Sequence, residues 1–304
     1  MSLGSIPALP WFRDEHELPR RLPTIEEIEA ASTEFPCIFD SSSRRVIRID
    51  EVFVVKYGPA VFENEGHALL AIEKTQSIPA PRLYAMYRQD EKLYIIMEYI
   101  PGHRLSDIWP SLSETGKLTI ANHLREIFDK LRALPSPGTF GGVLGGPLPH
   151  RYFFSYEKDP YITGPFNTED DVYRALVFKS KKNWDMCARR AYVAELFDRH
   201  RQDMLSGHNS VFTHADFQRK NILVRERYDS SSSIDGSDSK RSFEVAAVLD
   251  WEFAGWYPSH WEYSRCFTYF DWSDDWLEKM ERILNPCVPQ AALMRLVGQD
   301  LNQF

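Results

Sequence analysis

The segment "FTHADFQRKNILV", residues 212–224, places three polar side chains between two apolar runs. His214, Asp216 and Asn221 lie on what we expect to be a tight loop between the strands "SVFT" and "ILVR". A carboxylate can accept a proton, and a carboxylate or amide oxygen can bind a hard cation. The spacing predicts a chemical site here, with Asp216 as proton acceptor and His214 as a support that holds the loop by hydrogen bonding.

A further apolar run, "VAAVLDW", ends at Asp250 and predicts a strand that brings this carboxylate back beside Asn221. The low-complexity stretch between them, residues 228–240, is typical of a hairpin connection. One carboxylate and one amide, completed by water and phosphate oxygens, suit Mg²⁺. We therefore predict Asn221 and Asp250 as metal ligands, which leaves Asp216 available for the proton.

Chemistry on a nucleotide phosphate also needs a cation on the phosphates and an anion that holds the cation. Lys56 ends the β-rich run "VFVVK", and Glu65 opens the helix that follows. Taken singly, Lys56 could be an ordinary strand lysine and Glu65 a solvated helix residue, with Glu63 as the alternative partner. Their order along the chain with Asp216, Asn221 and Asp250 favours the functional interpretation.

Hydrophobic periodicity indicates the elements that must position these residues. The stretches "VIRIDEVFVVK", from Val46, and "RLYAMYRQDEKLYIIMEY", residues 82–99, predict two hairpins with a helix over 60–75 between them. Beyond residue 103 the pattern becomes helical, over 114–134 and again from 169 to about 206. The segment 140–166 is rich in glycine, proline and aromatic residues, and its length favours a substrate lid over the alternative of a long surface connection.

Composition restricts the class of protein. The chain has 304 residues, a formal net charge of −8 and no long basic run, which argues against nucleic acid as a partner. Its longest apolar stretches are far shorter than the ~20 residues that span a bilayer, so we expect no membrane partner. No signal peptide and no paired cysteine motif is evident, and we expect a cytoplasmic protein with reduced thiols. The oligomeric state stays open.

Together these motifs resemble the aminoglycoside phosphotransferase and choline-kinase-like enzyme family, which shares the protein-kinase fold. The family motif H-x-D-x-x-x-x-N is matched by His214, Asp216 and Asn221, and its later metal aspartate by "VLDW" at Asp250. The strand lysine is matched by "VVKYG", the helix glutamate by "EGHAL" and the lobe-connecting hinge by "MEYIPG". The similarity extends from about residue 38 to residue 263.

The resemblance implies an α+β, bilobal protein kinase-like fold. Residues 1–98 would form a small antiparallel-sheet, nucleotide-binding lobe with one helix, and residues 99–304 a larger, mainly helical lobe for catalysis and substrate binding. It implies ATP, or alternatively GTP, with Mg²⁺ as cofactors and a small-molecule hydroxyl compound as phosphoryl acceptor. Nucleotide contacts are expected from Ser42, Lys56, Glu65 and the backbone of Glu98, Tyr99 and Ile100, although the loop "SSSRRVIRI" around Ser42 lacks the expected glycine.

The region from Asp250 to residue 304 carries nine acidic and four basic residues, interleaved with tryptophans. An acidic, aromatic pocket would suit a cationic amino alcohol or aminoglycoside through charge and cation–π attraction. The residues predicted for this pocket are Trp251, Asp271, Asp274 and Asp275. The alternative is a solvated acidic face over a tryptophan-rich core.

Two other functions compete with small-molecule phosphotransfer. A protein kinase shares these motifs, but Asp250 is followed by "WEF" rather than Phe-Gly, no Ala-Pro-Glu follows, and few residues remain for peptide recognition. A catalytically silent nucleotide-binding or scaffold protein of the same fold is the other alternative, and the presence of Asp216 argues against it. Fold analogy cannot choose the acceptor.

Overall fold

The computed structural model describes residues 8–36, 43–227, 242–269 and 274–303. These residues form two compact units, which are described separately. The sheet unit contains the described residues up to Leu112 together with Arg219–Glu252, and the helical unit contains Ser113–Gln218 and the described residues from Phe253 onward. The predicted lobe boundary after residue 98 stays a prediction.

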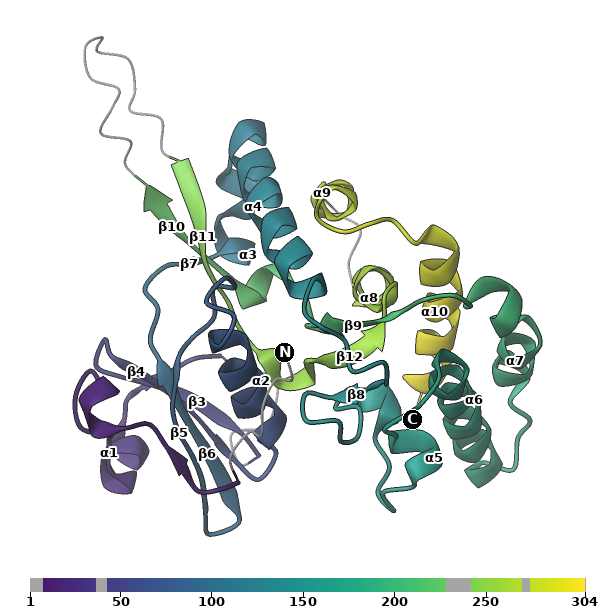
Figure 1. Ribbon diagram of the computed structural model, residues 1–304, viewed down its shortest axis with the longest axis horizontal. Coiled ribbons are helices and arrows are strands. Elements are labelled where there is room, and N and C mark those ends of the chain that lie inside the picture. The colour runs from purple at the N-terminus through teal and green to yellow at the C-terminus, as the bar shows by residue number, and fades with distance from the viewer. Residues whose placement is uncertain (1–7, 37–42, 228–241, 270–273, 304) are drawn as a thin grey trace. The chain divides into compact units, whose positions relative to one another are not determined.

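The sheet unit is built on an antiparallel sheet whose described strands run in the order β1-β5-β6-β4-β3-β2 (Figure 1). A second sheet of the same unit has the order β11-β10-β7. The strands are β1 Trp11–Phe12, β2 Thr33–Glu34, β3 Arg45–Ile49, β4 Phe53–Gly58, β5 Leu83–Gln89, β6 Lys92–Glu98, β7 His103–Arg104, β10 Ile222–Arg227 and β11 Ser242–Val248. The helices are α1 Ile25–Ala30, α2 Glu63–Glu73 and α3 Leu105–Ile108, with 3₁₀ turns at Glu15–Glu17, Trp109–Ser111, Arg219–Asn221 and Trp251–Phe253.

Both predicted hairpins are present in the large sheet. Strands β3 and β4 pair antiparallel around a turn after Asp50, and β5 and β6 pair around Asp90 and Glu91. Asp90 and Glu91 have φ angles of 47° and 63°, so both adopt the left-handed conformation that a two-residue hairpin loop requires. The predicted helix over 60–75 corresponds to α2, whereas the short helix α1 was not predicted.

The alternation of side chains along β4 decides what each face of the sheet contacts. Phe53, Val55 and Tyr57 lie in one buried cluster with Ile28 of α1. Because successive strand residues point to opposite faces, Lys56 faces the other side, which α2 covers. Gly66 permits the close approach of α2, since a Cβ atom at this position would lie 2.5 Å from the sulfur of Met86 in β5.

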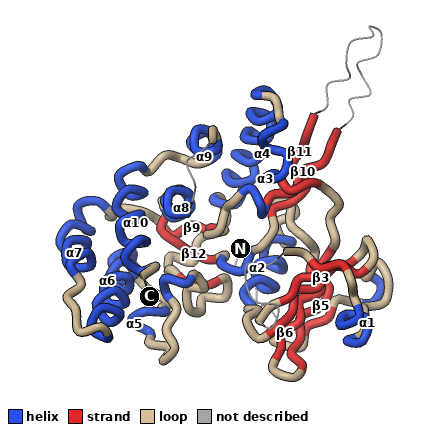
Figure 2. Tube along the Cα trace, turned by 180° about the vertical axis from the view of Figure 1, so that it is seen from behind, coloured by secondary structure: helices blue, strands red, loops and turns tan. Residues whose placement is uncertain are grey.

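The helical unit packs its helices around an aromatic core and a small sheet of order β8-β12-β9 (Figures 1 and 2). The strands are β8 Gly141–Gly142, β9 Ser210–Thr213 and β12 Gly255–Pro258, and a 3₁₀ turn spans Arg151–Phe153. The helices are α4 Glu114–Arg132, α5 Pro160–Thr163, α6 Glu169–Met186, α7 Tyr192–Met204, α8 Trp261–Tyr269, α9 Trp276–Ile283 and α10 Val288–Leu301. In the described part of the chain, no helix is both long enough and apolar enough to cross a membrane.

The structure refines two expectations for the helical unit. The helical region predicted from 169 to about 206 is present as two helices, since α6 ends at Met186 and α7 begins at Tyr192, with Ala188 in the left-handed conformation between them. The segment 140–166 is closed at its ends, since Phe140 and Phe166 exchange two backbone hydrogen bonds of 2.8 and 2.7 Å. Buried side chains such as Tyr152 and Phe153 anchor this segment, which favours a structured connection over a lid.

Candidate functional site

The predicted lysine, glutamate and aspartate come together in the sheet unit. Lys56 Nζ lies 2.6 Å from an oxygen of Glu65 and 2.8 Å from Oδ1 of Asp250. The lysine side chain is almost completely buried, so these contacts are protected from water. The pairing of Lys56 with Glu65 rather than Glu63 agrees with the predicted register, and Glu63 pairs instead with Arg88.

Two further charged residues complete this cluster and were missed in the sequence. Glu252 lies 3.0 Å from Lys56 Nζ and also pairs with Arg44, and all three side chains are buried. The signals were present, because Glu252 follows Asp250 by two positions and Arg44 lies in the expected nucleotide loop. Neither was singled out, since a lone glutamate or arginine of this kind is usually a surface residue.

Opposing influences set the protonation of the cluster. Burial alone would lower the pKa of Lys56, but Asp250, Glu65 and Glu252 raise it above its usual value, so the side chain is cationic. Burial raises the pKa of Glu65 to about 7, although Lys56 opposes this shift. Glu65, Asp250 and Glu252 can each offer one oxygen within 4.8 Å of the others. An oxygen-rich cluster of this kind fits a hard divalent cation.

Asn221 approaches the same cluster through the backbone. Ile222 pairs with Val248 between β10 and β11, and the N–H of Leu249 donates to the Asn221 carbonyl at 2.7 Å. The predicted return of the second strand beside Asn221 is therefore present. Asp250 then takes a φ of 63°, an uncommon left-handed conformation that is found more often at functional sites than elsewhere.

Two backbone N–H groups of the expected nucleotide hinge already donate hydrogen bonds within the sheet unit. The N–H of Glu98 donates to the Arg82 carbonyl and that of Tyr99 to the Val52 carbonyl, each at 2.9 Å. The guanidinium carbon of Arg48 lies over the Tyr99 ring, 5.2 Å from the centre of that ring. Ser42, the residue expected near the phosphates, lies outside the described residues.

The loop that carries Asp216 lies in the helical unit and is held by a buried carboxylate. Glu262, in the first turn of α8, accepts hydrogen bonds from the N–H groups of His214 at 2.8 Å and Ala215 at 3.1 Å. His214 is fully buried, and its Nδ1 accepts from the N–H of Asp216 at 3.2 Å, as expected of a supporting residue. Ala215 has a φ of 66°, so the loop is held in an uncommon conformation directly before Asp216.

Glu262 is a third residue that the sequence did not reveal. Burial raises its pKa, and His214, Arg132 and the two backbone N–H donors oppose that shift. A buried carboxylate with two backbone donors is a strong positioning device. The only signal in the sequence is a glutamate between two aromatic residues, Trp261 and Tyr263.

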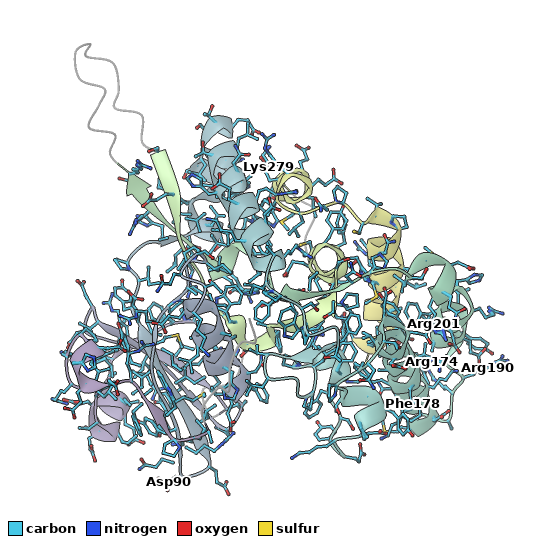
Figure 3. The ribbon with its side chains drawn as sticks, in the orientation of Figure 1. Asp90, Arg174, Phe178, Arg190, Arg201 and Lys279 are labelled. Carbon is cyan, nitrogen blue, oxygen red and sulfur yellow. The ribbon has the colours of Figure 1, made fainter. Side chains whose placement is uncertain are left out.

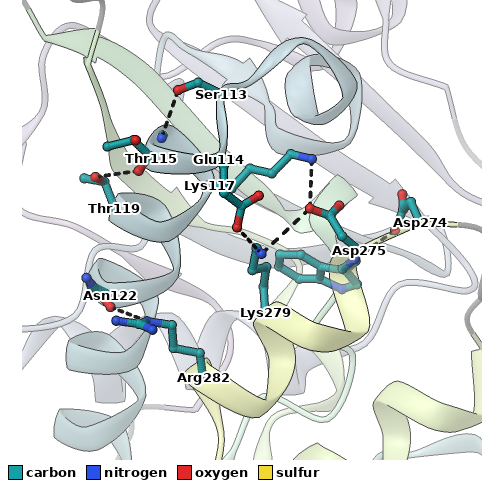
Figure 4. A network of polar contacts seen from close by, with 12 residues as sticks. Ser113, Glu114, Thr115, Lys117, Thr119, Asn122, Asp274, Asp275, Lys279 and Arg282 are labelled. Atoms are coloured by element: carbon teal, nitrogen blue, oxygen red, sulfur yellow. Dashed lines mark hydrogen bonds and ion pairs between the residues drawn. The ribbon is translucent and has the colours of Figure 1, made fainter.

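The predicted acidic pocket finds other partners in the structure. Asp275 forms an ion pair with Lys117 of α4, with 2.9 Å between the nitrogen and the carboxylate oxygen, and Lys279 of α9 pairs with Glu114 (Figure 4). Asp274 accepts from the N–H of Trp276 at 3.0 Å. The ion pairs of Asp275 and Glu114 therefore join α4 to α9, and Asp274 caps the start of α9, while Asp271 lies outside the described residues.

The tryptophans of this region form core. Trp251 is 1% exposed, and its indole N–H donates to the Val248 carbonyl at 2.8 Å. Trp256, Trp261 and Trp276 are buried as well. The burial of each of these four side chains favours the alternative of tryptophans in the core over a substrate pocket lined by Trp251.

Comparisons with known proteins identify the family. A sequence model of the phosphotransferase enzyme family matches residues 39–292. The chain belongs to this family. The match covers the lysine, the glutamate, the H-x-D-x-x-x-x-N motif and Asp250, so the predicted membership of the phosphotransferase family is confirmed.

Solved structures resemble this phosphotransferase family member at low sequence identity. Aminoglycoside phosphotransferase APH(3'')-Id from Streptomyces rimosus is 13% identical with a TM-score of 0.54, covering 91% of this chain and 95% of the other. APH(2'')-Ib with ADP and the streptomycin–ATP complex of APH(2'')-IIa are each 13% identical, with TM-scores of 0.54 and 0.53 and coverage of 90% and 86%. This likeness confirms the predicted α+β kinase-like fold. A comparison with curated proteins gave no significant match.

Proposed function

We propose that this protein is an ATP- and Mg²⁺-dependent phosphotransferase that moves the γ-phosphoryl group to a hydroxyl of a small molecule. The observation that carries the proposal is the buried contact of Lys56 with both Glu65 and Asp250. Phosphoryl transfer depends on positioning and charge neutralisation, and this arrangement supplies a fixed cation held by carboxylates. The ATP complex of APH(2'')-IIa and the ADP complex of APH(2'')-Ib support the choice of an adenine nucleotide.

Each residue has a defined task in the proposed reaction. Lys56 neutralises nucleotide phosphates, Glu65 keeps Lys56 in place, and Asn221 and Asp250 hold the metal. When bound, Mg²⁺ supplies positive charge to the phosphate oxygens. Because the N–H groups of Glu98 and Tyr99 already donate within the sheet unit, adenine recognition is assigned to the Ile100 backbone and to carbonyl groups of this segment.

Asp216 acts on the acceptor. Its carboxylate orients the acceptor hydroxyl and takes its proton as the hydroxyl oxygen bonds to the γ-phosphorus, and the bond from that phosphorus to the β–γ bridging oxygen breaks to release ADP. Glu262 and His214 hold the backbone around Asp216 in place before the substrate binds, so binding does not have to order this loop.

The acceptor is proposed as a class only. APH(2'')-IIa is known in complex with streptomycin, which supports a hydroxyl-rich, cationic acceptor as one candidate. In this chain, however, Lys117 already pairs with Asp275. A neutral hydroxyl compound therefore stands beside the cationic amino alcohol or aminoglycoside as a candidate acceptor.

The test is a panel of cationic and neutral hydroxyl metabolites with ATP and Mg²⁺, read by mass spectrometry for the mass of one added phosphoryl group. Asp216→Asn serves as the inactive control, and thermal shift with ATP and Mg²⁺ measures nucleotide binding separately. Phosphorylation of a small molecule by the parent protein but not by the variant supports the proposal. Binding of ATP without transfer to any compound would favour a silent nucleotide-binding protein, and transfer only to polypeptides would favour a protein kinase.

A further inference from the structure

A second cluster of metal-ligating side chains lies in the helical unit, outside the residues assigned to phosphoryl transfer. Glu169 is the first residue of α6, His208 precedes β9, and His260 directly precedes α8. One carboxylate oxygen and one nitrogen of each imidazole all lie within 4.8 Å of one another. Three segments that are distant in the sequence thus converge with two imidazoles and a carboxylate.

The geometry of the cluster is fixed by hydrogen bonds to each member. Nδ1 of His208 lies 2.7 Å from Oε1 of Glu169, and the backbone N–H of His208 donates to Oε2 of Glu169 at 3.0 Å. The rings of His208 and His260 face each other edge to face, 4.6 Å apart. The side chains are therefore ordered before any ion arrives.

Outer contacts orient His260 toward the cluster. Its Nδ1 lies 2.9 Å from the Ser264 hydroxyl, which leaves Nε2 on the inner side, 2.6 Å from the Tyr173 hydroxyl. The Tyr173 hydroxyl also lies 2.8 Å from Oε1 of Glu169. A partner on the second ring nitrogen is the usual arrangement for a metal-binding histidine, because it fixes the ring orientation and the tautomer.

Access and local charge are compatible with a cation. His260 is fully buried, whereas the side chains of His208 and Glu169 are 14% and 15% exposed, so water reaches one side of the cluster. The neighbouring Asp170 pairs with Arg174 and Arg201, which Figure 3 shows on α6 and α7. These arginines are thus occupied by another carboxylate, and Glu169 faces the two imidazoles.

A hydrogen-bonded network is the alternative to a metal site. If His208 and Tyr173 both donate to Glu169, then His260 Nε2 donates to Tyr173 and Ser264 donates to His260, and every group is satisfied. That network accounts for the contacts without an ion. Such a network needs no particular set of side chains. The side chains present here, two histidines and one glutamate, are the donor set of a three-ligand zinc site with one coordination position left open.

We propose that Glu169, His208 and His260 form a binding site for a zinc-type divalent cation. Binding places the lone pairs of His208 Nδ1 and His260 Nε2 on the ion and moves each ring proton to the other nitrogen, so neutral imidazoles release no net proton. The moved proton of His260 is then donated to Ser264. Tyr173 continues to donate to Glu169, and water completes the coordination.

An ion at this site would join elements that support the Asp216 loop. Strand β9 follows His208 and leads into His214, and Glu262 follows His260 by two positions in α8. A bound cation would therefore stabilise the two segments whose contact holds the backbone of His214 and Ala215: the strand β9 and the first turn of α8 that carries Glu262. Metal binding is expected to raise the melting temperature of the chain through linkage.

The test uses metal-free full-length protein and Zn²⁺ or Co²⁺ as probes. After dialysis, elemental analysis should find one tightly held Zn²⁺ per chain, and Co²⁺ should give the visible absorption of a low-coordinate site. The variants H208Q and E169Q should bind Zn²⁺ on the order of 100-fold more weakly, with unchanged circular dichroism. H200Q, at an exposed histidine of α7, is the matched control.

The outcomes are separable from the phosphoryl-transfer site. D250N should keep one Zn²⁺ per chain, because Asp250 belongs to a different cluster. Absence of tight Zn²⁺ binding in the parent protein would overturn the proposal in favour of the hydrogen-bonded network. Loss of Zn²⁺ in D250N together with retention in H208Q would also overturn it, since the ion would then lie at the Lys56 cluster.

Discussion

At the scale of single residues, the Lys56 cluster contains more negative than positive charge. Lys56 and Arg44 face Glu65, Asp250 and Glu252, two cations against three carboxylates. A buried excess charge is costly unless a proton or a cation compensates it. The raised pKa of Glu65, about 7, is the response expected of the cluster without a metal, and a bound divalent cation would remove the need for that proton.

The roles of Asp216 and Asp250 can be separated by the same substitution at each position. Asp216→Asn should retain nucleotide and Mg²⁺ binding but lower kcat by roughly 10²- to 10⁴-fold, because only the proton acceptor is lost. Asp250→Asn should instead weaken Mg²⁺-dependent nucleotide binding. Calorimetric titration of the nucleotide and steady-state rates provide the two measurements.

Asp203→Asn, at an exposed position of α7, is the matched control and should change neither quantity. An equal loss of nucleotide affinity in the Asp216 and Asp250 variants would contradict the division of roles.

At the scale of elements, the helix α8 holds the Asp216 loop through one side chain. Glu262 accepts from two backbone N–H groups, which no neutral side chain of the same size can do as well, because an amide directs a donor at one of them. Glu262→Gln should lower the free energy of unfolding by about 1–3 kcal/mol and kcat by on the order of 10²-fold, with the KM for ATP unchanged. Urea unfolding and steady-state kinetics check these effects.

The control for this variant is Glu281→Gln on α9, since Glu281 accepts a single hydrogen bond from the Tyr263 hydroxyl near the surface. If Glu262→Gln loses stability but keeps its full kcat, the carboxylate stabilises the fold and does not position the catalytic loop.

Elements could be predicted wherever local and periodic signals agreed. The β5–β6 hairpin was predictable because two apolar, aromatic-rich runs flank Asp90 and Glu91, which tolerate the turn. The break between α6 and α7 was not, since residues 187–191 contain helix-forming alanine and arginine and no proline or glycine. Helix α1 had an unused signal, the capping box between Thr24 and Glu27.

At the scale of the whole molecule, the order of motifs revealed the Lys56 cluster but not all of its members. Lys56, Glu65 and Asp250 were predictable because each occupies a fixed place relative to a strand or helix end. Arg44 and Glu252 were not, and neither was Glu262 of the helical unit, since burial turns an ordinary charged residue into a site residue and a single sequence does not show burial. The tryptophan-rich tail was ambiguous for the same reason, and packing favours a core.

The stability of the whole chain should depend on pH through His150, a buried histidine of the helical unit. Its Nδ1 accepts from the N–H of Tyr152 at 3.2 Å, and the ring is 1% exposed. Burial, together with the positive charges of Arg265, Arg151 and Lys179, lowers its pKa well below the usual 6.5. The folded state therefore keeps this imidazole neutral.

The sign of the effect follows from proton binding. Below pH 6.5 the unfolded chain protonates His150 and the folded chain does not, so the stabilisation is complete above pH 6.5 and declines as the pH falls. The decline from this residue approaches about 1.4 kcal/mol per pH unit.

The variant His150→Gln retains a hydrogen-bond acceptor but has no proton to bind at this position, so its stability should not show this decline. The stability difference between parent and variant, measured by urea unfolding, should therefore shrink from pH 7.5 to pH 5.5. His200→Gln, at an exposed histidine, should leave the pH dependence unchanged. Parallel curves for the parent and His150→Gln would mean that His150 takes up its proton in the folded state, and the buried, positively charged surroundings would then have to open to water within this pH range.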